Sequence, residues 1–219
     1  MRRVTLVFFL FLLLPSPVLA ADELPDVADV LAVYNAGIEA AMTGIDSLFV
    51  RQEVIEHCPD GEDRTASAHL SYNRADGLSR TVIESDLRYP SGKYRLESLV
   101  GPVLRPDEYE VELTGVEEME GEECLRLELR ALVRDVDHFD GTLWVSVVDG
   151  GPVRIEGGVA DRPFPAREIL LDKSFIPVSG GFRLVRRHTG EVEIGLLVGS
   201  SRGVRHIFYE GYVVRTARR

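Results

Sequence analysis

Most of this chain is a succession of short strand patterns separated by turns. From residue 48 onward, stretches rich in β-branched and aromatic residues alternate with clusters of glycine, proline, aspartate and serine. Tyr109, Val111 and Leu113 alternate with glutamates, which places one strand face in the interior and the other in water. About nine to eleven such strands, joined by connections of two to five residues, predict an antiparallel meander. The later strands are expected at Tyr94–Val100, Tyr109–Leu113, Leu125–Leu129, Thr142–Val148, Val153–Glu156, Arg167–Phe175, Phe182–His188, Glu191–Val198 and Val204–Val214, with turns at Gly190 and Ser200–Gly203.

One helix pattern precedes the strands. Apolar residues recur at a spacing of three to four from Leu24 to Ile45, with Pro25 suited to the first turn and Gly44 to the C-terminal end. A helix followed by strands predicts an α+β fold in a single domain, residues 21–219. One helix of about 30 Å covers only part of the apolar face of such a sheet. The sheet therefore closes into a barrel, acquires a second short helix, or leaves a cleft that another molecule fills.

The first 20 residues have the layout of a secretory signal peptide. Arg2 and Arg3 precede an apolar run, and Val18-Leu19-Ala20 resembles the cleavage site that ends a signal peptide. The apolar run is shorter than the roughly 20 residues that span a bilayer, and no later stretch comes closer. The residue directly after the expected cleavage point is Ala21, not the cysteine that a lipoprotein requires. The sequence therefore predicts an exported protein that is neither integral to the membrane nor anchored as a lipoprotein.

The charge balance excludes one class of partner. The chain has 25 basic and 36 acidic residues, a formal net charge of −11. Such a surface repels phosphate backbones, so no nucleic-acid partner is expected. The same excess of negative charge argues against docking on anionic lipid head groups through a basic patch.

No catalytic or metal-binding pattern stands out. Gly199–Gly203 fits G-x-S-x-G, but a nucleophile elbow requires a helix after the serine, and a strand pattern follows here. The five histidines are scattered, and the acidic run Glu117–Glu123 lacks the ligand order of a calcium loop, which favours a solvated hairpin tip. We therefore expect no enzyme activity, no cofactor and no metal.

The two cysteines leave two alternatives open. In an exported chain, Cys58 and Cys124 can form one disulfide. Equally, they can be two half-buried strand thiols, because the sequence does not place their Cα atoms within bridging range.

Three segments carry a resemblance to a known family. They are Glu120–Leu129, the run Gly141-Thr142-Leu143-Trp144-Val145, and Gly151–Glu156. This succession is similar to the outer-membrane lipoprotein-sorting family, the LolA/LolB-like periplasmic proteins. The resemblance implies a half-barrel: an unclosed, strongly curved antiparallel sheet whose apolar concave side is capped by helices. It also implies that this side accepts acyl chains or another hydrophobic ligand.

The resemblance also implies a function and a site. The expected function is that of a periplasmic, non-enzymatic carrier or sensor that binds a lipid or an acylated lipoprotein in the concavity. The alternative is an envelope module that binds a protein partner with the same face. Arg51 lies on the strand that carries the functional arginine of the LolA carrier. The side chains expected to face the cavity, each with ordinary core packing as its alternative, are Leu70, Tyr72, Leu127, Leu129, Trp144 and Phe182.

Overall fold

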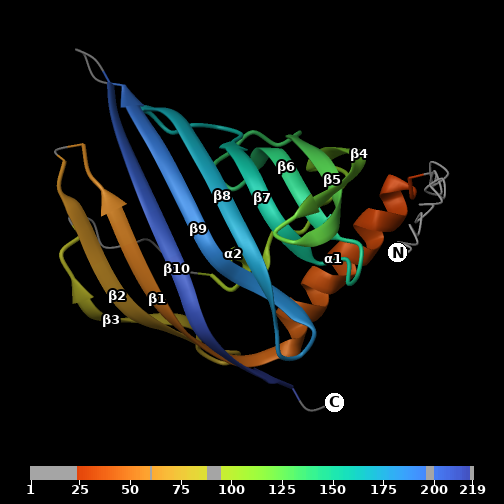
Figure 1. Ribbon diagram of the computed structural model, residues 1–219, viewed down its shortest axis with the longest axis horizontal. Coiled ribbons are helices and arrows are strands. Elements are labelled where there is room, and N and C mark those ends of the chain that lie inside the picture. Colours follow the sequence, from red (N-terminus) through yellow and green to blue (C-terminus); the bar gives the residue numbers. More distant parts are fainter. Residues whose placement is uncertain (1–23, 60, 88–94, 196–199, 218–219) are drawn as a thin grey trace, which may run out of the picture.

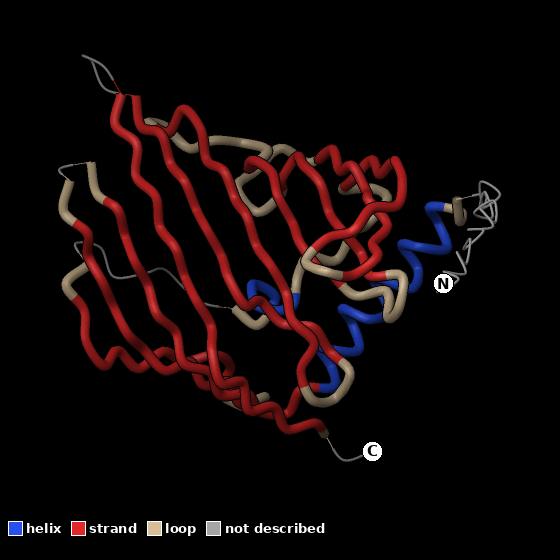
Figure 2. Tube along the Cα trace, in the orientation of Figure 1, coloured by secondary structure: helices blue, strands red, loops and turns tan. Residues whose placement is uncertain are grey.

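The computed structural model describes residues 24–59, 61–87, 95–195 and 200–217. The expected signal peptide, residues 1–20, lies outside this range. The described part is dominated by strands, with one long helix and one short helix (Figure 2). Neither helix is long and apolar enough to cross a membrane.

The described strands form one antiparallel sheet of ten, within the predicted range of nine to eleven. Its order is β3-β2-β1-β10-β9-β8-β7-β6-β5-β4, so β3 and β4 are free edges and the sheet is unclosed (Figure 1). The predicted α+β class is confirmed. The strands are β1 (Ile45–His57), β2 (Asp63–Asn73), β3 (Gly77–Ser85), β4 (Tyr109–Met119), β5 (Glu122–Ala131), β6 (Phe139–Ser146), β7 (Pro152–Val159), β8 (Ala166–Val178), β9 (Phe182–Gly195) and β10 (Ser200–Thr216).

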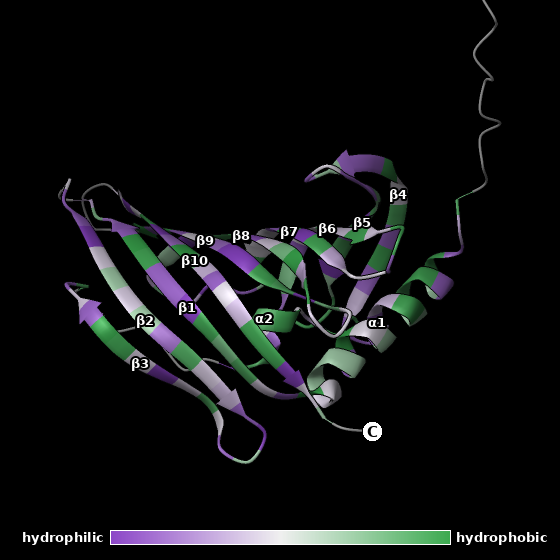
Figure 3. Ribbon diagram, turned by 60° about the horizontal axis from the view of Figure 1, so that its bottom comes forward, coloured by the Kyte–Doolittle hydropathy of each residue, from purple (hydrophilic) through white to green (hydrophobic). Residues whose placement is uncertain are grey.

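The predicted N-terminal helix is α1 (Val27–Gly44). It begins later than the periodicity indicated because Asp26 is its N-cap, accepting a hydrogen bond of 2.7 Å from the Ala28 amide. One stripe of the helix is buried in the main core: Val30, Tyr34, Ile38 and Ala41. In Figure 3, α1 and the second helix lie on the same side of the curved sheet.

The strand predicted at Tyr94–Val100 is wrong where the structure describes it. That segment contains the short helix α2 (Glu97–Val100), and Tyr94 lies outside the described residues. Leu96, Leu99 and Val100 are buried in the main core, at the spacing of one helical face. The connection after α2 is joined to α1. The Tyr34 hydroxyl donates to the Pro102 carbonyl at 2.9 Å. The Asn35 side chain donates to the Leu104 carbonyl and accepts from the Leu104 amide.

Two predicted turns lie inside long strands. Gly190 falls within β9, which merges the two strands expected at 182–188 and 191–198, and residues 196–198 lie outside the described part. The expected turn Ser200–Gly203 is the first part of β10. Glycine and serine clusters usually mark turns between strands. Here β9 and β10 pair without interruption from Ser200 to Phe208, so these residues lie within strands instead.

A close approach of two backbones accompanies the sheet's curvature between β6 and β7. Gly141 and Gly157 are direct partners in the register of this pair. A Cβ atom on Gly157 would lie 2.2 Å from the Asp140 carbonyl oxygen, and one on Gly141 would lie 2.1 Å from that of Glu156. Only glycine fits at these two positions.

A buried arginine ties the β8–β9 hairpin to neighbouring turns. Arg183 donates to both carboxylate oxygens of Glu122, at 2.7 and 2.8 Å, and to Asp149 at 2.9 Å. Its side chain is only 6% exposed. Hydrogen bonds from Arg183 hold the pKa of the Glu122 carboxyl below its usual value.

Candidate functional site

A recess lies on the concave face where β8, β9 and β10 extend beyond the helices. We call this recess, with a volume of about 530 Å³, the apolar pocket. Most of its lining comes from alternate positions of β8, β9 and β10, on the face that carries the main core, and residues of β1, β2 and their connection complete it. The apolar side chains that line it are Ile169, Leu171, Val192, Ile194 and Ile207. Gly190 and Gly203 also line the pocket, so the absence of side chains there adds to its width.

Polar groups stand at one side of this pocket. Arg205 on β10 donates to Glu56 on β1 at 2.6 Å, and these side chains are 29% and 18% exposed. His188 on β9 is mostly enclosed, and desolvation together with the charges of Lys173 and Arg205 lowers its pKa to about 3. The imidazole is therefore neutral near pH 7. In the described part of the chain, its Nε2 atom is buried without a hydrogen-bond partner.

A second recess, the helix-side hollow, adjoins the apolar pocket. Its volume is about 550 Å³, and it lies between the α2 segment and strands β6 to β8. Leu171 lines both recesses, which makes them neighbours on the concave face. Lys173 lines the helix-side hollow and is the direct register partner of His188. Volumes of 300–1,000 Å³ are typical of small-molecule sites.

The Lys173 ammonium is enclosed and has no counter-ion among the described residues. Burial lowers its pKa from 10.5 to about 8. No hydrogen bond or ion pair joins it to any residue that the structure describes. The concave face therefore presents a cation and a neutral imidazole on adjacent strands, both beside an apolar recess.

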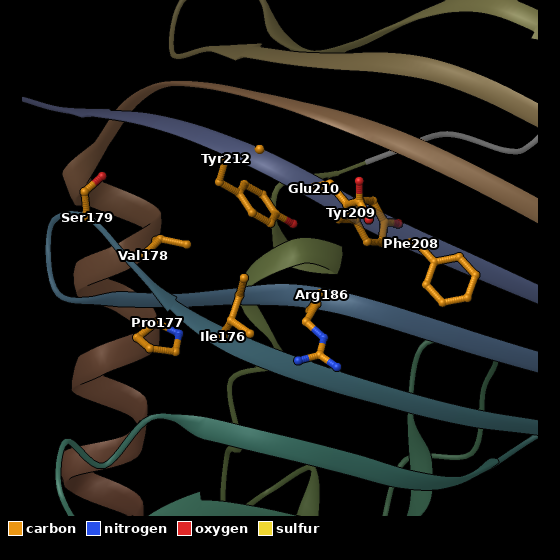
Figure 4. A pocket seen from close by; sticks show the side chains of 10 residues that line it. Ile176, Pro177, Val178, Ser179, Arg186, Phe208, Tyr209, Glu210 and Tyr212 are labelled. Atoms are coloured by element: carbon orange, nitrogen blue, oxygen red, sulfur yellow. The ribbon is translucent and has the colours of Figure 1, made fainter. Parts of the chain in front are cut away.

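A third recess lies where β9 and β10 separate. Within the described residues, β10 pairs with β9 only as far as Phe208; beyond it, β10 pairs with β1 and β9 with β8. The recess in this split measures about 750 Å³ (Figure 4). The Tyr212 hydroxyl spans the split and donates to the Val185 carbonyl at 2.6 Å. Polar and apolar surface contribute about equally to its lining, which includes Arg186 and Glu210, whereas apolar surface predominates in the apolar pocket. This larger recess therefore suits an acyl chain less well.

The residues predicted to face the cavity divide into two groups. Leu70, Leu127 and Leu129 are buried in the main core, and Tyr72 and Phe182 pack against it. None of these five lines the apolar pocket or the helix-side hollow. The space between α1 and the sheet is filled by this core, so the recesses lie beside the helices rather than beneath α1.

Arg51 and Trp144 face the other side of the sheet. Arg51 lies between the buried residues Val50 and Gln52, and it forms an ion pair with Glu53 on the exposed face. Trp144 belongs to a separate small cluster with Cys124 and two other residues, and the Arg154 guanidinium lies 5.9 Å from its ring centroid. The expectation that Trp144 faces the concavity is wrong, because the strand register puts Leu143 and Val145 there instead.

Both cysteines are free thiols in this structure. Cys58 lines the apolar pocket, whereas Cys124 lies in the small cluster on the opposite face. The disulfide alternative is therefore not realised. Burial raises the pKa of the Cys124 thiol to about 11.

The sequence analysis missed the residues that line the recesses, although one signal was present. Ile169, Leu171, Lys173 and Phe175 occupy alternate positions of one strand, so a lysine interrupts an otherwise apolar face. No described group of three or more histidines, cysteines or carboxylates is placed to hold a metal.

The sequence matches no family model and no curated protein. Among solved structures, it matches a domain from Vibrio parahaemolyticus described as an outer membrane lipoprotein-sorting protein. The match covers 88% of this chain and 94% of that chain, with 10% identity and a TM-score of 0.51. The chain has the LolA-like fold.

Two further structures align over similar lengths. A LolA superfamily protein from Nitrosomonas europaea matches over 87% of this chain and 94% of that chain, with 17% identity and a TM-score of 0.45. A chain of the Pseudomonas aeruginosa MucA/MucB complex covers 83% of this chain and 94% of its own length, with 10% identity and a TM-score of 0.30. The LolA-like fold implied by the sequence resemblance is thus confirmed as a fold.

Proposed function

We propose that this protein is an exported, non-enzymatic carrier or sensor that holds an acyl chain on its concave face. The acyl chain belongs to a lipid or to an acylated lipoprotein. The observation that carries the proposal is the pair of adjoining recesses on the concave face, about 530 and 550 Å³, which α1 does not fill. The LolA-like fold adds support, and residues 1–20 are proposed to be a cleaved signal peptide that directs the chain to the periplasm.

The physical driving force is burial of hydrocarbon. Each methylene removed from water contributes roughly 0.8 kcal/mol, so half of a 16-carbon chain contributes roughly 6 kcal/mol. The apolar pocket offers branched aliphatic side chains from three strands for this contact. No step of chemistry is required, and Ser201 lies within β10, where no helix follows it. We therefore expect that any esterase activity measured for the wild-type protein is the same for the Ser201→Ala variant.

The decisive experiment is native mass spectrometry of the protein purified from its own cell envelope. We expect a mass shift that matches a lipid or an acylated peptide. Leu171→Asp places a carboxylate between the two recesses and should abolish this shift. Leu170→Asp is the matched control, because Leu170 is the neighbouring residue on the opposite face and is 36% exposed. Absence of any bound lipid in the wild-type protein, or equal loss in both variants, contradicts the proposal.

The split between β9 and β10 favours a second candidate, an envelope module that binds a protein. After Phe208 in β10, and before Arg187 in β9, the edges with which these two strands face each other form no backbone ladder in the described part of the chain. Unpaired strand edges are where extended peptides add to sheets. This candidate predicts that a protein without lipid co-purifies with the wild-type chain. It also predicts that Leu171→Asp leaves that partner bound.

A further inference from the structure

Lys173 is an exception among the enclosed cations in the part of the chain that the structure describes. Arg183, Arg205 and Arg154 each contact a carboxylate, at distances between 2.6 and 3.0 Å. Lys173 lines the helix-side hollow and has no such partner among the described residues. An ionised group held away from water without a counter-ion is unfavourable, and proteins retain few of them outside functional sites.

The choice of lysine at this position is also unusual for the chain. The sequence has 23 arginines and only two lysines, Lys93 and Lys173. Arginine suits planar pairing with the many carboxylates of an acidic surface. A lysine ammonium is a compact point charge that can pair with a single anionic group in a confined space. Lys173 is therefore unusual both in being a lysine and in having no carboxylate partner among the described residues.

The neighbouring strand supplies a second unpartnered group. His188 faces Lys173 directly in the β8–β9 register, and its buried Nε2 has no hydrogen-bond partner among the described residues. A neutral imidazole can donate one hydrogen bond without adding charge. Glu56 lines the neighbouring apolar pocket and is paired with Arg205. Arg95, Glu97 and Asp137 also line the helix-side hollow, but all three are exposed, so Lys173 is its enclosed charge and favours an anion there.

We infer that the ligand of the concave face is a single-chain amphiphile with a carboxylate head group, which pairs with Lys173 while its acyl chain enters the apolar pocket. This inference rests on the proposed function and specifies its ligand. One lysine matches one negative charge, which favours a carboxylate over a dianionic phosphate. From Lys173 the chain passes Leu171, which lines both recesses, and reaches Ile169 about 13 Å further along β8. His188 donates to the carboxylate from the adjacent strand.

The inference is tested with probes that differ only in their head group. Delipidated full-length protein is titrated calorimetrically with hexadecanoate, hexadecanol and hexadecyltrimethylammonium, all below their aggregation concentrations. We expect hexadecanoate to bind at least tenfold more tightly than the other two. Lys173→Met should remove this preference and leave the affinity for hexadecanol unchanged. Lys173→Arg keeps the positive charge and should retain most of the preference.

A spectroscopic readout separates pairing from a general effect on folding. With only two lysines, ¹³Cε-lysine labelling gives two side-chain signals, and Lys173→Met assigns one of them. Hexadecanoate should raise the pKa of Lys173, whereas hexadecanol should not. Equal affinities for hexadecanoate and hexadecanol, with no shift of this signal, overturn the inference and leave the proposed function standing. Failure of all three probes to bind overturns the proposed function itself.

Discussion

Replacing Lys173 with methionine is expected to stabilise the protein while removing its ligand preference. Burial lowers the pKa of the Lys173 ammonium from 10.5 to about 8. At 1.36 kcal/mol for each pKa unit, this shift corresponds to roughly 3 kcal/mol of unfavourable free energy at pH 7. Methionine has a similar unbranched shape and carries no charge. We therefore expect the free energy of unfolding to rise by about 1–3 kcal/mol, measured by urea denaturation.

The dependence on pH makes this prediction specific. The pKa of Lys173 is lower in the folded state, so the unfolded chain binds more protons between about pH 8 and pH 10.5. The penalty is fully present below pH 8 and disappears as the pH rises to 10.5. The stability of the wild-type protein should therefore approach that of Lys173→Met across this interval. A variant that is no more stable at pH 7, or a difference that does not shrink by pH 10.5, would refute the reasoning.

Three further predictions concern the scaffold, each measured as a free energy of unfolding. Gly157→Ala should cost more than 3 kcal/mol, because its Cβ meets backbone at 2.2 Å, whereas Gly158→Ala, whose closest contact is 3.4 Å, should cost less than about 1 kcal/mol. Arg183→Met should cost about 3 kcal/mol, because it leaves two partly buried carboxylates unpaired, and Arg130→Met, in an exposed ion pair, should cost less than about 1 kcal/mol. Gly37→Ala should add about 1 kcal/mol, because Gly37 is an exposed position within α1 with open space around it; a loss of stability would contradict this.

Local patterns were sufficient to predict much of the fold. The alternation at Tyr109, Val111 and Leu113 predicted β4, and the apolar periodicity from Leu24 to Ile45 predicted α1. Each signal depends only on the period of one element. The prediction failed where long-range pairing decides the outcome. Gly190 lies in mid-strand because β8 and β10 flank it on both sides, and no local signal contains that information.

The site was harder to predict than the fold. Whether Trp144 faces the core or the opposite side depends on the register with β5 and β7, and a shift of one residue exchanges the faces. The recesses also depend on which part of the concave face the helices cover, and this is set by the hydrogen bonds that Tyr34 and Asn35 make with the connection after α2. Lys173 was accessible in principle, as a charged residue at an inward position of β8.

The separation of β9 from β10 divides the sheet into two leaves, β3-β2-β1-β10 on one side and β9 to β4 on the other. The ladder between Ser200 and Phe208 joins them, with the Tyr212 hydroxyl as a strut beyond it. The apolar pocket lies across this spine, with Ile207 on one leaf and Val192 on the other. A guest in the pocket touches both leaves at once, so its arrival braces the junction at which β9 and β10 pair over only part of their lengths.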